Sequence, residues 1–502
     1  MGDVRAFDRV YYARYSNLLW ASVAIILLAA TACGGGGGAN PPVNQAPVAA
    51  VTATPDNGPA PLNVQLDASA SNDPDGVITA YDWDFDGDGT FDLLDGGATP
   101  AVQTFNAAGN FTVGLRVHDD GGLVGATTVG ITVTGGGALT WQLQTLDTGG
   151  VGEFCSMAIV DGRPAISYYD AANGNLKYMR AADATGTTWA IGSDIDVTSD
   201  PSDDGTATSL AVIGGNPAIS FHDIGNNDLR FIRAADTAGT DWSTPAVIVE
   251  AVGIDATTSL AAVGGSPAVA YDSGGEVFYE IAVDAAGTDW SNASREIDGA
   301  AETGRWPSLA MVDGRPAVAF QRDTGDDELF FVRAGDATGN GPWQVPAQLH
   351  ADGASEGVGY YPSLAMVDGM PAVSYEYYIA IGNADPYFVR ASTAGGDAGT
   401  WDAPAPLSLD AAATIDGGGY SSLAVIGGVP QVAFYNYSDA TLMHVRAQDA
   451  SGSSWLQPEV VDDGNGGAND VGMYASLVGV GGQPAIAYYD WTDGDLEFAV
   501  LQ

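Results

Sequence analysis

Five aspartates lie close together between residues 84 and 95, within the stretch YDWDFDGDGTFDLLD. They occupy positions 1, 3, 5, 9 and 12 of a twelve-residue frame, and Gly89 stands at position 6. Carboxylate oxygens at this density are hard ligands of the kind that Ca²⁺ prefers. Since no helical pattern flanks the loop, capping of turn amides by Asp84 is the alternative role. The expected calcium ligands are Asp84, Asp86, Asp88, Asp92 and Asp95.

Aromatic and charged side chains form a second candidate site, between residues 305 and 437. Flat rings beside carboxylates suit sugars, which offer C–H faces and hydroxyls together, and Tyr and Trp are also favoured anchors at protein interfaces. Packing inside the fold is the alternative role, because tyrosine recurs at matching positions such as Tyr168 and Tyr488. The candidate ligand-binding residues are Arg305, Trp306, Arg322, Tyr360, Tyr361, Tyr375, Glu376, Tyr377, Tyr378, Tyr420 and Tyr435, with Tyr437 beside them.

Catalytic motifs are missing from the sequence. It contains no Gly-x-Ser-x-Gly elbow, no His-Glu-x-x-His zinc site and no phosphate loop. Tyr375-Glu376 is an adjacent tyrosine–glutamate pair in the same region as Arg305 and Arg322, but no third arginine joins them. We therefore expect no catalytic residues and no organic cofactor, and a hydrolase remains the alternative.

The charge of the chain excludes one class of partner. Its 502 residues contain 63 Asp and Glu against 16 Lys and Arg, a formal net charge of −47. A field of this sign repels phosphate backbones and attracts cations, so nucleic acid is not an expected partner.

The N-terminus predicts export. Three arginines precede the apolar run LLWASVAIILLAATA, which is short for a membrane span and suits a signal peptide over residues 1–33. The ending Ala-Thr-Ala-Cys resembles a bacterial lipoprotein signal, which implies lipidation of Cys33. Ordinary cleavage, giving a secreted protein, and an uncleaved anchor are the alternatives. We expect an outer-membrane or cell-surface lipoprotein held to the membrane only by its lipid, with residues 34–45 as a flexible Gly/Pro-rich linker.

Residues 46–135 predict a small all-β sandwich. Thr, Val and aromatic residues alternate with period two between Asp-Pro, Asp-Gly and Gly-Gly turns. The segment resembles a PKD domain, an Ig-like sandwich that commonly serves as a spacer or adhesion module. The resemblance rests on Asp67-x-Ser69-x-Ser71 before Asp73-Pro74-Asp75-Gly76, Tyr81-x-Trp83-Asp84-Phe85, and Phe105 with Gly109-x-Phe111. Trp83 and Phe85 are expected in its core.

Residues 138–502 are built from a sequence repeat. Its serine recurs seven times, at Ser156, Ser209, Ser259, Ser308, Ser363, Ser422 and Ser476. Its tryptophan recurs at steps of 48 to 58 residues from Trp189 to Trp455, and Trp141 precedes the first by 48 residues. Four short β segments per unit cannot bury both faces alone, so the units must pack on one another. We expect a seven-bladed β-propeller whose last blade pairs residues 140–147 with residues 476–500.

The turn before each tryptophan resembles a relaxed Asp-box of sialidase-like propellers. Asp183-x-x-Gly186-x-x-Trp189 shows the pattern, and this resemblance implies that Asp braces the turn while Trp packs between blades. Five arginines precede these turns, and we expect them to bond acids or turn carbonyls. A sialidase-like glycoside hydrolase is the enzyme hypothesis that follows from the resemblance.

The variable loops favour one face of the propeller as a binding site. The loops after the second β segment differ in length and sequence, whereas the turns at the other end repeat too uniformly to have diverged for recognition. The predicted function is therefore a non-catalytic cell-surface binding protein whose partner is a glycan or a surface protein, with adhesion as one role. A purely structural surface module is a further alternative.

Overall fold

The computed structural model describes residues 43–502 except 61, 88, 101, 106–108, 135–138, 190–194, 197–203, 254–256, 298, 300–302, 324–326, 352–356, 381–382 and 408–415. The chain divides into two compact units, Met1–Gly135 and Gly136–Gln502. Both are built of strands, as the sequence predicts, and one four-residue helix, α1 (Gly464–Gly467), lies in the second. In the described part of the chain no helix is long and apolar enough to cross a membrane.

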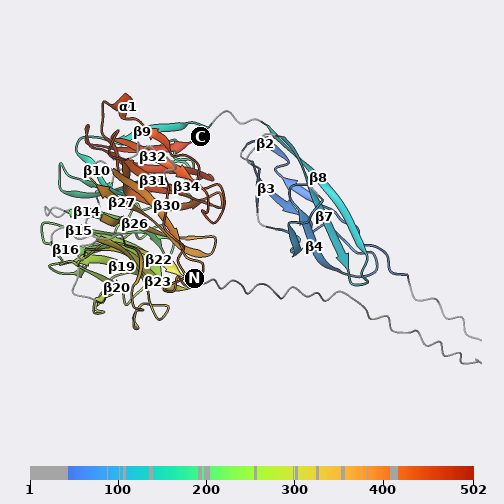
Figure 1. The fold of residues 1–502 in the computed structure, drawn as a ribbon, viewed down its shortest axis with the longest axis horizontal. Helices are drawn as coiled ribbons and strands as arrows, with labels where there is room; N and C mark the ends of the chain where they lie inside the picture. Colours follow the sequence, from blue (N-terminus) through green and yellow to red (C-terminus); the bar gives the residue numbers. More distant parts are fainter. Residues whose placement is uncertain are drawn as a thin grey trace, which may run out of the picture. The chain divides into compact units, whose positions relative to one another are not determined.

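The first unit is a sandwich of two sheets (Figure 1). One has the strand order β1-β3-β6 and the other β2-β8-β7-β4-β5. The strands are β1 (Thr52–Thr54), β2 (Asn57–Pro59), β3 (Leu62–Asp67), β4 (Ile78–Asp84), β5 (Leu93–Gly96), β6 (Gln103–Phe105), β7 (Gly109–Asp119) and β8 (Val124–Thr134). Trp83 is fully buried between the sheets, and Phe85 packs against its ring at the edge of this core.

The second unit contains seven four-stranded antiparallel sheets among its described residues, here numbered 1 to 7. Sheets 1 to 3 consist of β10 (Val151–Val160), β11 (Arg163–Asp170), β12 (Asn175–Arg180) and β13 (Ile195–Asp196); β14 (Asp204–Ile213), β15 (Asn216–Asp223), β16 (Asp228–Arg233) and β17 (Ala246–Val249); β18 (Thr258–Val263), β19 (Ser266–Ser273), β20 (Glu276–Ile281) and β21 (Arg295–Glu296).

Sheets 4 to 7 repeat the same order. They consist of β22 (Thr303–Val312), β23 (Arg315–Asp323), β24 (Asp327–Arg333) and β25 (Ala347–Ala351); β26 (Gly357–Val367), β27 (Met370–Ala380), β28 (Asn383–Arg390) and β29 (Ala405–Pro406); β30 (Gly417–Ile426), β31 (Val429–Asn436), β32 (Thr441–Arg446) and β33 (Glu459–Asp462); β34 (Val471–Val480), β35 (Gln483–Asp490), β36 (Asp495–Leu501) and β9 (Trp141–Asp147).

Strand β9 completes the last sheet, as the displaced tryptophan of the repeat predicts. It pairs antiparallel with β36, from Leu496 opposite Asp147 to Leu501 opposite Trp141. In Figure 1 the cyan β9 lies among the red strands of the chain end. The first and last parts of the second unit are therefore joined in one sheet.

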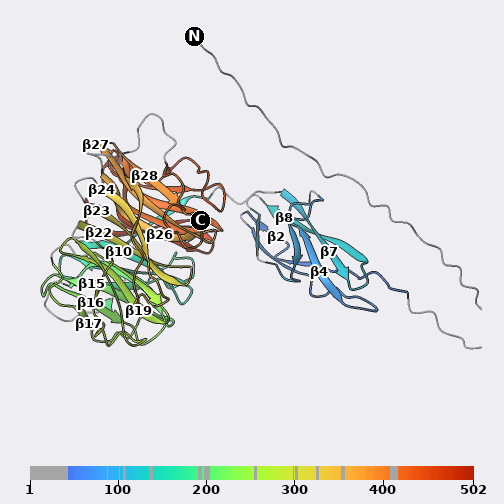
Figure 2. The same cartoon turned by 60° about the horizontal axis from the view of Figure 1, so that its bottom comes forward.

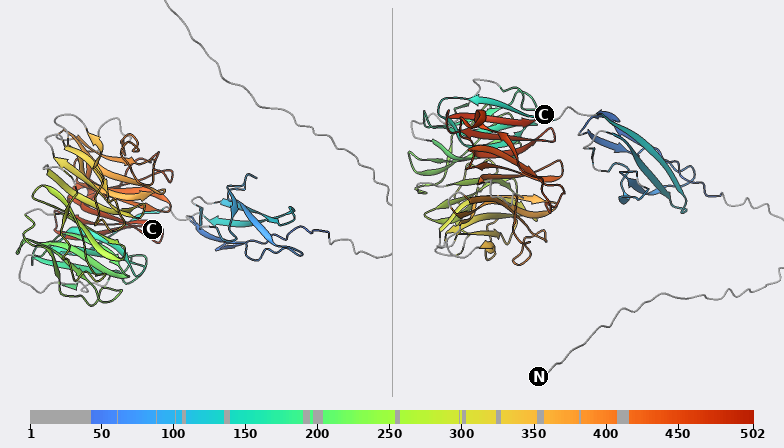
Figure 3. Two further views of the ribbon diagram at one scale, coloured as in Figure 1. Left: turned by 90° about the horizontal axis from the view of Figure 1, so that it is seen from below. Right: turned by 45° about the horizontal axis from the view of Figure 1, so that its top comes forward.

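The first strand of each sheet, here called the inner strand, contacts the inner strands of its neighbours. These contacts run from sheet 1 to sheet 7 and return from β34 to β10, so the sheets form a ring. In Figures 2 and 3 the sheets follow one another in the order of the sequence colours.

The repeat serines bond each inner strand to the next. The hydroxyl of each serine accepts a hydrogen bond of 2.9 to 3.0 Å from a backbone amide of the following sheet. Ser156 accepts from Leu210, and the series ends with Ser476, which accepts from Met157 of sheet 1. We call these seven bonds the serine belt. The recurrence of the serine in every unit is therefore explained by contacts between sheets.

The repeat tryptophans have the structural role that the sequence predicts. Each of the six from Trp189 to Trp455 donates its indole N–H to a glycine carbonyl of its own turn at 2.8 to 3.0 Å. Its ring packs against an aromatic ring of the preceding sheet at 5.0 to 5.3 Å between centroids. Four of the five arginines that precede the turns bond turn carbonyls or acids, namely Arg180, Arg233, Arg333 and Arg390. Arg180, for example, donates to the Val160 carbonyl and to Asp161.

Replacing one belt serine should destabilise the ring. In Ser308→Ala the Leu364 amide loses its acceptor, and an unmade buried hydrogen bond costs about 1–2 kcal/mol of unfolding free energy. Urea unfolding followed by tryptophan fluorescence measures this. Ser438→Ala, in an exposed loop, is the control and should change the free energy by less than about 0.5 kcal/mol. Equal effects of the two substitutions would contradict the role of the belt.

Candidate functional site

A strained residue stands two positions before the repeat serine in six of the seven sheets. Its backbone is left-handed, with φ between 47° and 56°, although none of the six is glycine. For bulky side chains this conformation costs on the order of 1 kcal/mol or more, and it persists only where surrounding contacts impose it. The six residues are Phe154, Ala207, Trp306, Tyr361, Tyr420 and Tyr474.

Two features of the sheets impose this backbone. The register between inner and second strands shifts at these positions, as at a β-bulge. The residue just before the repeat serine also holds the strained residue of the preceding sheet. Thr208 Oγ1 donates to the Phe154 carbonyl at 2.9 Å, and Ser421 Oγ donates to the Tyr361 carbonyl at 2.9 Å.

Five of these side chains form a continuous curved wall, here called the aromatic arc. The centroid of the Trp306 ring lies 5.0 Å from that of Tyr361, and each further step, through Tyr420 and Tyr474 to Phe154, is 4.6 Å. Neighbouring rings are tilted by 32° to 51°. The arc thus runs through sheets 4, 5, 6, 7 and 1, one ring from each.

The aromatic arc borders a central cavity of about 490 Å³ that is lined by residues of all seven sheets. On the other side the equivalent positions hold the small residues Ala207 and Thr257, which leaves room there. The lining on that side includes hydroxyl groups and one imidazole, from Thr206, Thr208, Thr257, Thr258 and His222. The cavity therefore has an apolar aromatic wall facing a polar wall.

Two buried carboxyl groups lie next to residues that line this cavity. Burial raises the pKa of Glu376 to about 7, although the Tyr437 hydroxyl donates to it at 3.0 Å. Burial also raises the pKa of Asp272 to about 6, against hydrogen bonds from Thr257 and the charge of Arg305. Among the described residues that line the cavity there is no Lys or Arg. The electrostatic environment thus disfavours anions.

Three predicted ligand-binding residues line the cavity: Trp306, Tyr361 and Tyr420. Others stand next to the aromatic arc. Tyr360 contacts the Trp306 ring at 5.2 Å and donates to Asp327. The buried Tyr435 donates to Asp470 at 2.6 Å and contacts the rings of Tyr420 and Tyr437 at 6.5 and 5.0 Å; Tyr437 itself is 40% exposed.

The remaining predicted residues lie away from the cavity. Tyr375 and Tyr377 are buried in the hydrophobic core with their rings against His350, because alternate residues of β27 point to opposite faces. Arg322 lies over the Phe330 ring at 4.0 Å. Arg305 is exposed and Tyr378 half-buried, and neither belongs to the cavity lining.

Sequence reasoning missed Phe154, Tyr474 and the threonine wall. The signal was present in the repeat, because the residue two positions before each serine reads Phe154, Ala207, Thr257, Trp306, Tyr361, Tyr420 and Tyr474. Aligning the units on their serines shows that five of the seven are aromatic. What the alignment does not reveal is the bulge that turns this position toward the cavity.

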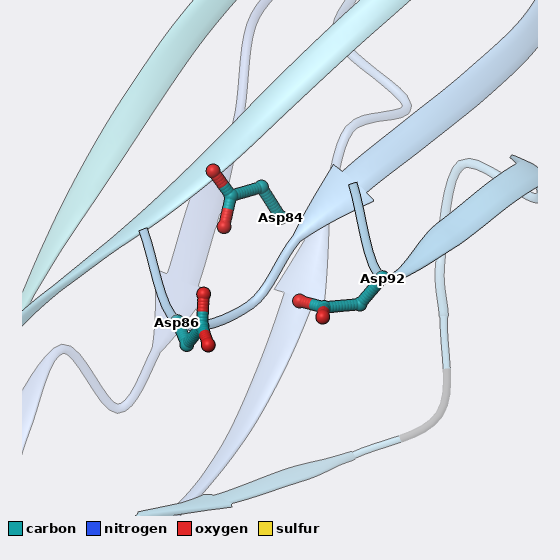
Figure 4. Close-up of side chains that lie close together, drawn as sticks. All are labelled: Asp84, Asp86 and Asp92. Atoms are coloured by element: carbon teal, nitrogen blue, oxygen red, sulfur yellow. The ribbon is translucent and has the colours of Figure 1, made fainter. Parts of the chain in front are cut away.

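The acidic loop of the first unit brings three of its five aspartates together. One carboxylate oxygen from each of Asp84, Asp86 and Asp92 lies within 4.8 Å of the others (Figure 4). Asp84 also accepts from the amides of Gly87 and Gly89 at 2.7 and 3.0 Å, as expected for a turn cap. Asp95 is on β5, whereas Asp88 and Cys33 lie outside the described residues.

The raised pKa of Glu376 predicts that stability falls as pH rises. Its pKa is about 7 in the folded chain against an ordinary 4.5, so folding takes up a proton between these values. The stabilisation is therefore complete below about pH 4.5 and lost as pH rises to about 7. Glu280 and Glu497, also near 7, add to the same slope.

The melting temperature measured from pH 5 to pH 8 checks this. We expect Tm to fall over the interval in the unaltered protein, and to fall less steeply in Glu376→Gln. Glu296→Gln, at an exposed position, is the matched control and should keep the original slope. Identical slopes in the unaltered protein and Glu376→Gln would show that the carboxyl ionises normally.

Comparisons with known proteins assign the first unit. The PKD domain family matches residues 44–134. The PKD1 domain of Vibrio anguillarum Epp is 31% identical over 19% of this chain and 100% of its own length, with a TM-score of 0.16. Over the longer second unit the likenesses are weaker.

Two solved structures resemble larger parts of the chain. A mutant of AofleA from Arthrobotrys oligospora is 13% identical, covers 65% of this chain and 91% of its own, and has a TM-score of 0.39. The NanB sialidase from Streptococcus pneumoniae is 10% identical, and the match covers 91% of this chain and 93% of the sialidase chain, with a TM-score of 0.40. The sequence match carries the assignment: through residues 44–134, this chain belongs to the PKD domain family.

Proposed function

We propose that the second unit is a seven-bladed β-propeller that binds the terminal unit of a neutral glycan in its central cavity. The observation that carries this proposal is the aromatic arc, five rings from five sheets held in a strained backbone around one cavity. The bulge imposes this backbone at Ala207 as well, where the side chain is small, so the choice of large rings at the other five positions is what points to binding.

The chemistry of the walls favours a sugar. A pyranose presents C–H groups on its faces, which pack against aromatic rings, and hydroxyls around its edge. The arc supplies the rings, and the threonines of sheets 2 and 3 supply polar groups opposite. The cavity of about 490 Å³ is within the usual size of small-molecule sites, about 300–1,000 Å³.

The charges favour a neutral sugar over an acidic one. Glu376 lies beside the aromatic arc and Asp272 bonds Thr257 of the polar wall, and the lining contains no cation among the described residues. The net charge of −47 adds repulsion at longer range. A sialic or uronic acid would have to bring its carboxylate toward these groups without a basic partner.

A glycoside hydrolase is the second candidate, and one pair of residues favours it. Tyr437 donates to Glu376 at 3.0 Å near the cavity, and a carboxyl whose pKa is about 7 could act as a general acid. However, burial and the charge of Glu376 raise the pKa of Tyr437 well above its usual value, which weakens it as a nucleophile. We therefore propose binding without turnover.

The N-terminal segments suggest where the protein acts. We propose export with lipidation at Cys33, and a cell-surface or outer-membrane position in which residues 34–45 and the PKD domain separate the propeller from the membrane. Secretion without a lipid and a purely structural role are the alternatives. Partition of the mature protein into detergent, together with incorporation of radioactive palmitate, distinguishes anchoring from secretion.

Binding of neutral methyl glycosides tests the proposed function. The panel contains the glycosides of glucose, galactose, mannose, fucose and N-acetylglucosamine, with sialic and glucuronic acids as the anionic comparison, measured by isothermal titration. We expect one or more neutral sugars to bind and Tyr420→Ala to weaken that binding about tenfold, the loss of a stacked ring. Tyr420→Phe keeps the ring and should retain the affinity.

Several outcomes would contradict the proposed function. Preferred binding of an acidic sugar would exclude the neutral class. Equal affinities in the unaltered protein and Tyr420→Ala would move the site away from the cavity. Turnover of fluorogenic glycosides that is lost in Glu376→Gln would establish the hydrolase instead.

We also propose that Asp84, Asp86 and Asp92 hold Ca²⁺, with Asp88 and Asp95 as further candidate ligands. Three converging carboxylates form an oxygen-rich site of the kind found in extracellular calcium modules, whose dissociation constants are about 10⁻⁴–10⁻³ M. Calorimetric titration should show binding in this range and at least tenfold weaker binding in Asp86→Ala. Asp402→Ala, an exposed aspartate of the second unit, is the control. No heat at millimolar calcium would exclude the site.

A further inference from the structure

An exposed tryptophan, Trp491, lies at the outer end of a series of contacting aromatic rings that begins at the cavity. Trp491 lies between β35 and β36 and is 57% exposed. Its ring contacts Tyr489 edge-on at 6.2 Å between centroids, and Tyr489 contacts Tyr474 at 6.2 Å. Because Tyr474 lines the cavity, a series of ring contacts joins the cavity to the exposed loop, with Tyr489 itself buried between Tyr474 and Trp491.

The loop that carries Trp491 is fixed at several points. The Trp491 amide donates to the Asp470 carbonyl at 2.8 Å, and the Asp470 amide donates to Thr492 Oγ1 at 2.8 Å. Asp490 accepts from the amides of Thr492 and Asp493 at 2.8 and 2.9 Å. A ring presented on such a loop loses little conformational freedom when a ligand covers it, which favours affinity.

The same repeat position is occupied differently in other sheets. Ala171 and Gly274 offer little or no side chain, and Tyr437 uses its hydroxyl to bond Glu376. Among the hydrogen bonds of the described residues, none involves the indole nitrogen of Trp491, so its N–H can serve a ligand. Carboxylates that can accept sugar hydroxyls are close by: Glu153 accepts from the Tyr489 hydroxyl at 3.4 Å, and Asp495 begins β36 directly after the loop.

We infer that the binding site extends from Tyr474 in the cavity to the exposed ring of Trp491, which the buried Tyr489 supports, so that the ligand is a neutral oligosaccharide rather than a single sugar. Its terminal unit occupies the cavity, and the following unit stacks on Trp491. This inference rests on the proposed function, and it adds the chain length of the ligand and a second subsite. The carboxylates beside these rings exclude acidic units there too, because no described basic residue lines this part of the site.

Affinity as a function of chain length tests the inference. The probes are two neutral series titrated against the full mature chain by calorimetry: glucose, cellobiose and cellotriose, and N-acetylglucosamine with its β-1,4-linked dimer and trimer. We expect affinity to rise at least tenfold from the single sugar to the dimer in one series. In Trp491→Ala this rise should vanish while the affinity for the single sugar stays within about twofold.

Two control variants and one spectroscopic measurement distinguish stacking of a sugar on Trp491 from a general loss of protein stability. Trp491→Phe keeps a ring and should retain most of the rise. Leu456→Ala removes another exposed apolar side chain, 49% exposed, and should leave both affinities unchanged. Acrylamide quenching of tryptophan emission should decrease more with the dimer than with the single sugar, which covers only Trp306 in the cavity, and this additional decrease should be absent in Trp491→Phe.

The outcomes distinguish this inference from the proposed function. If single sugars bind and depend on Tyr420 but the rise survives in Trp491→Ala, the outer subsite is wrong and the cavity site stands. If single sugar and dimer bind equally in the unaltered protein, the ligand is one unit. If neither series binds and no neutral methyl glycoside of the panel binds, both proposals fail.

Discussion

The hydrogen bond from a backbone amide to the repeat serine of the preceding sheet is the interaction on which the second unit depends. A four-stranded sheet in this chain exposes two apolar faces and cannot be stable alone. The serine bond fixes the height of each inner strand relative to the next, and seven such bonds return to the starting sheet. A shift of any inner strand is therefore opposed by the serine bonds that join it to the neighbouring sheets.

The serine belt also explains how a binding surface can arise from repeated units. In six of the seven sheets the residue two positions before the serine leaves the regular pairing, and in these units it borders the cavity. Its side chain borders the cavity, and its identity differs from unit to unit, from Ala207 to Trp306. Five of these positions hold large rings and two hold small residues. The cavity therefore has an aromatic wall on one side and a polar wall on the other, although the sheets around it repeat the same strand order.

Much of the architecture could be predicted from the sequence because it depends on spacing. Trp141 preceding Trp189 by one repeat indicated that β9 belongs to the last sheet, and the Trp-Asp-Phe stretch of the first unit indicated its core. The site was harder to predict, because whether a residue belongs to it depends on the face of the strand to which its side chain points. Tyr375 and Glu376 are adjacent in sequence, yet strand alternation sends the tyrosine into the core and leaves the glutamate facing Tyr437. The bulge at Tyr420 follows from register shifts that no local pattern in the sequence reveals.

The pairing of β9 with β36 has a consequence for biosynthesis. Thr145 and Glu497 are 352 residues apart, so the sheet that joins the ends can form only after almost the whole chain has been made. Until then β9 remains an unpaired edge directly after the PKD domain, which can fold first from its own local contacts. The slow step of maturation should therefore be this last pairing, and chains truncated near the C-terminus should expose a strand edge that favours aggregation.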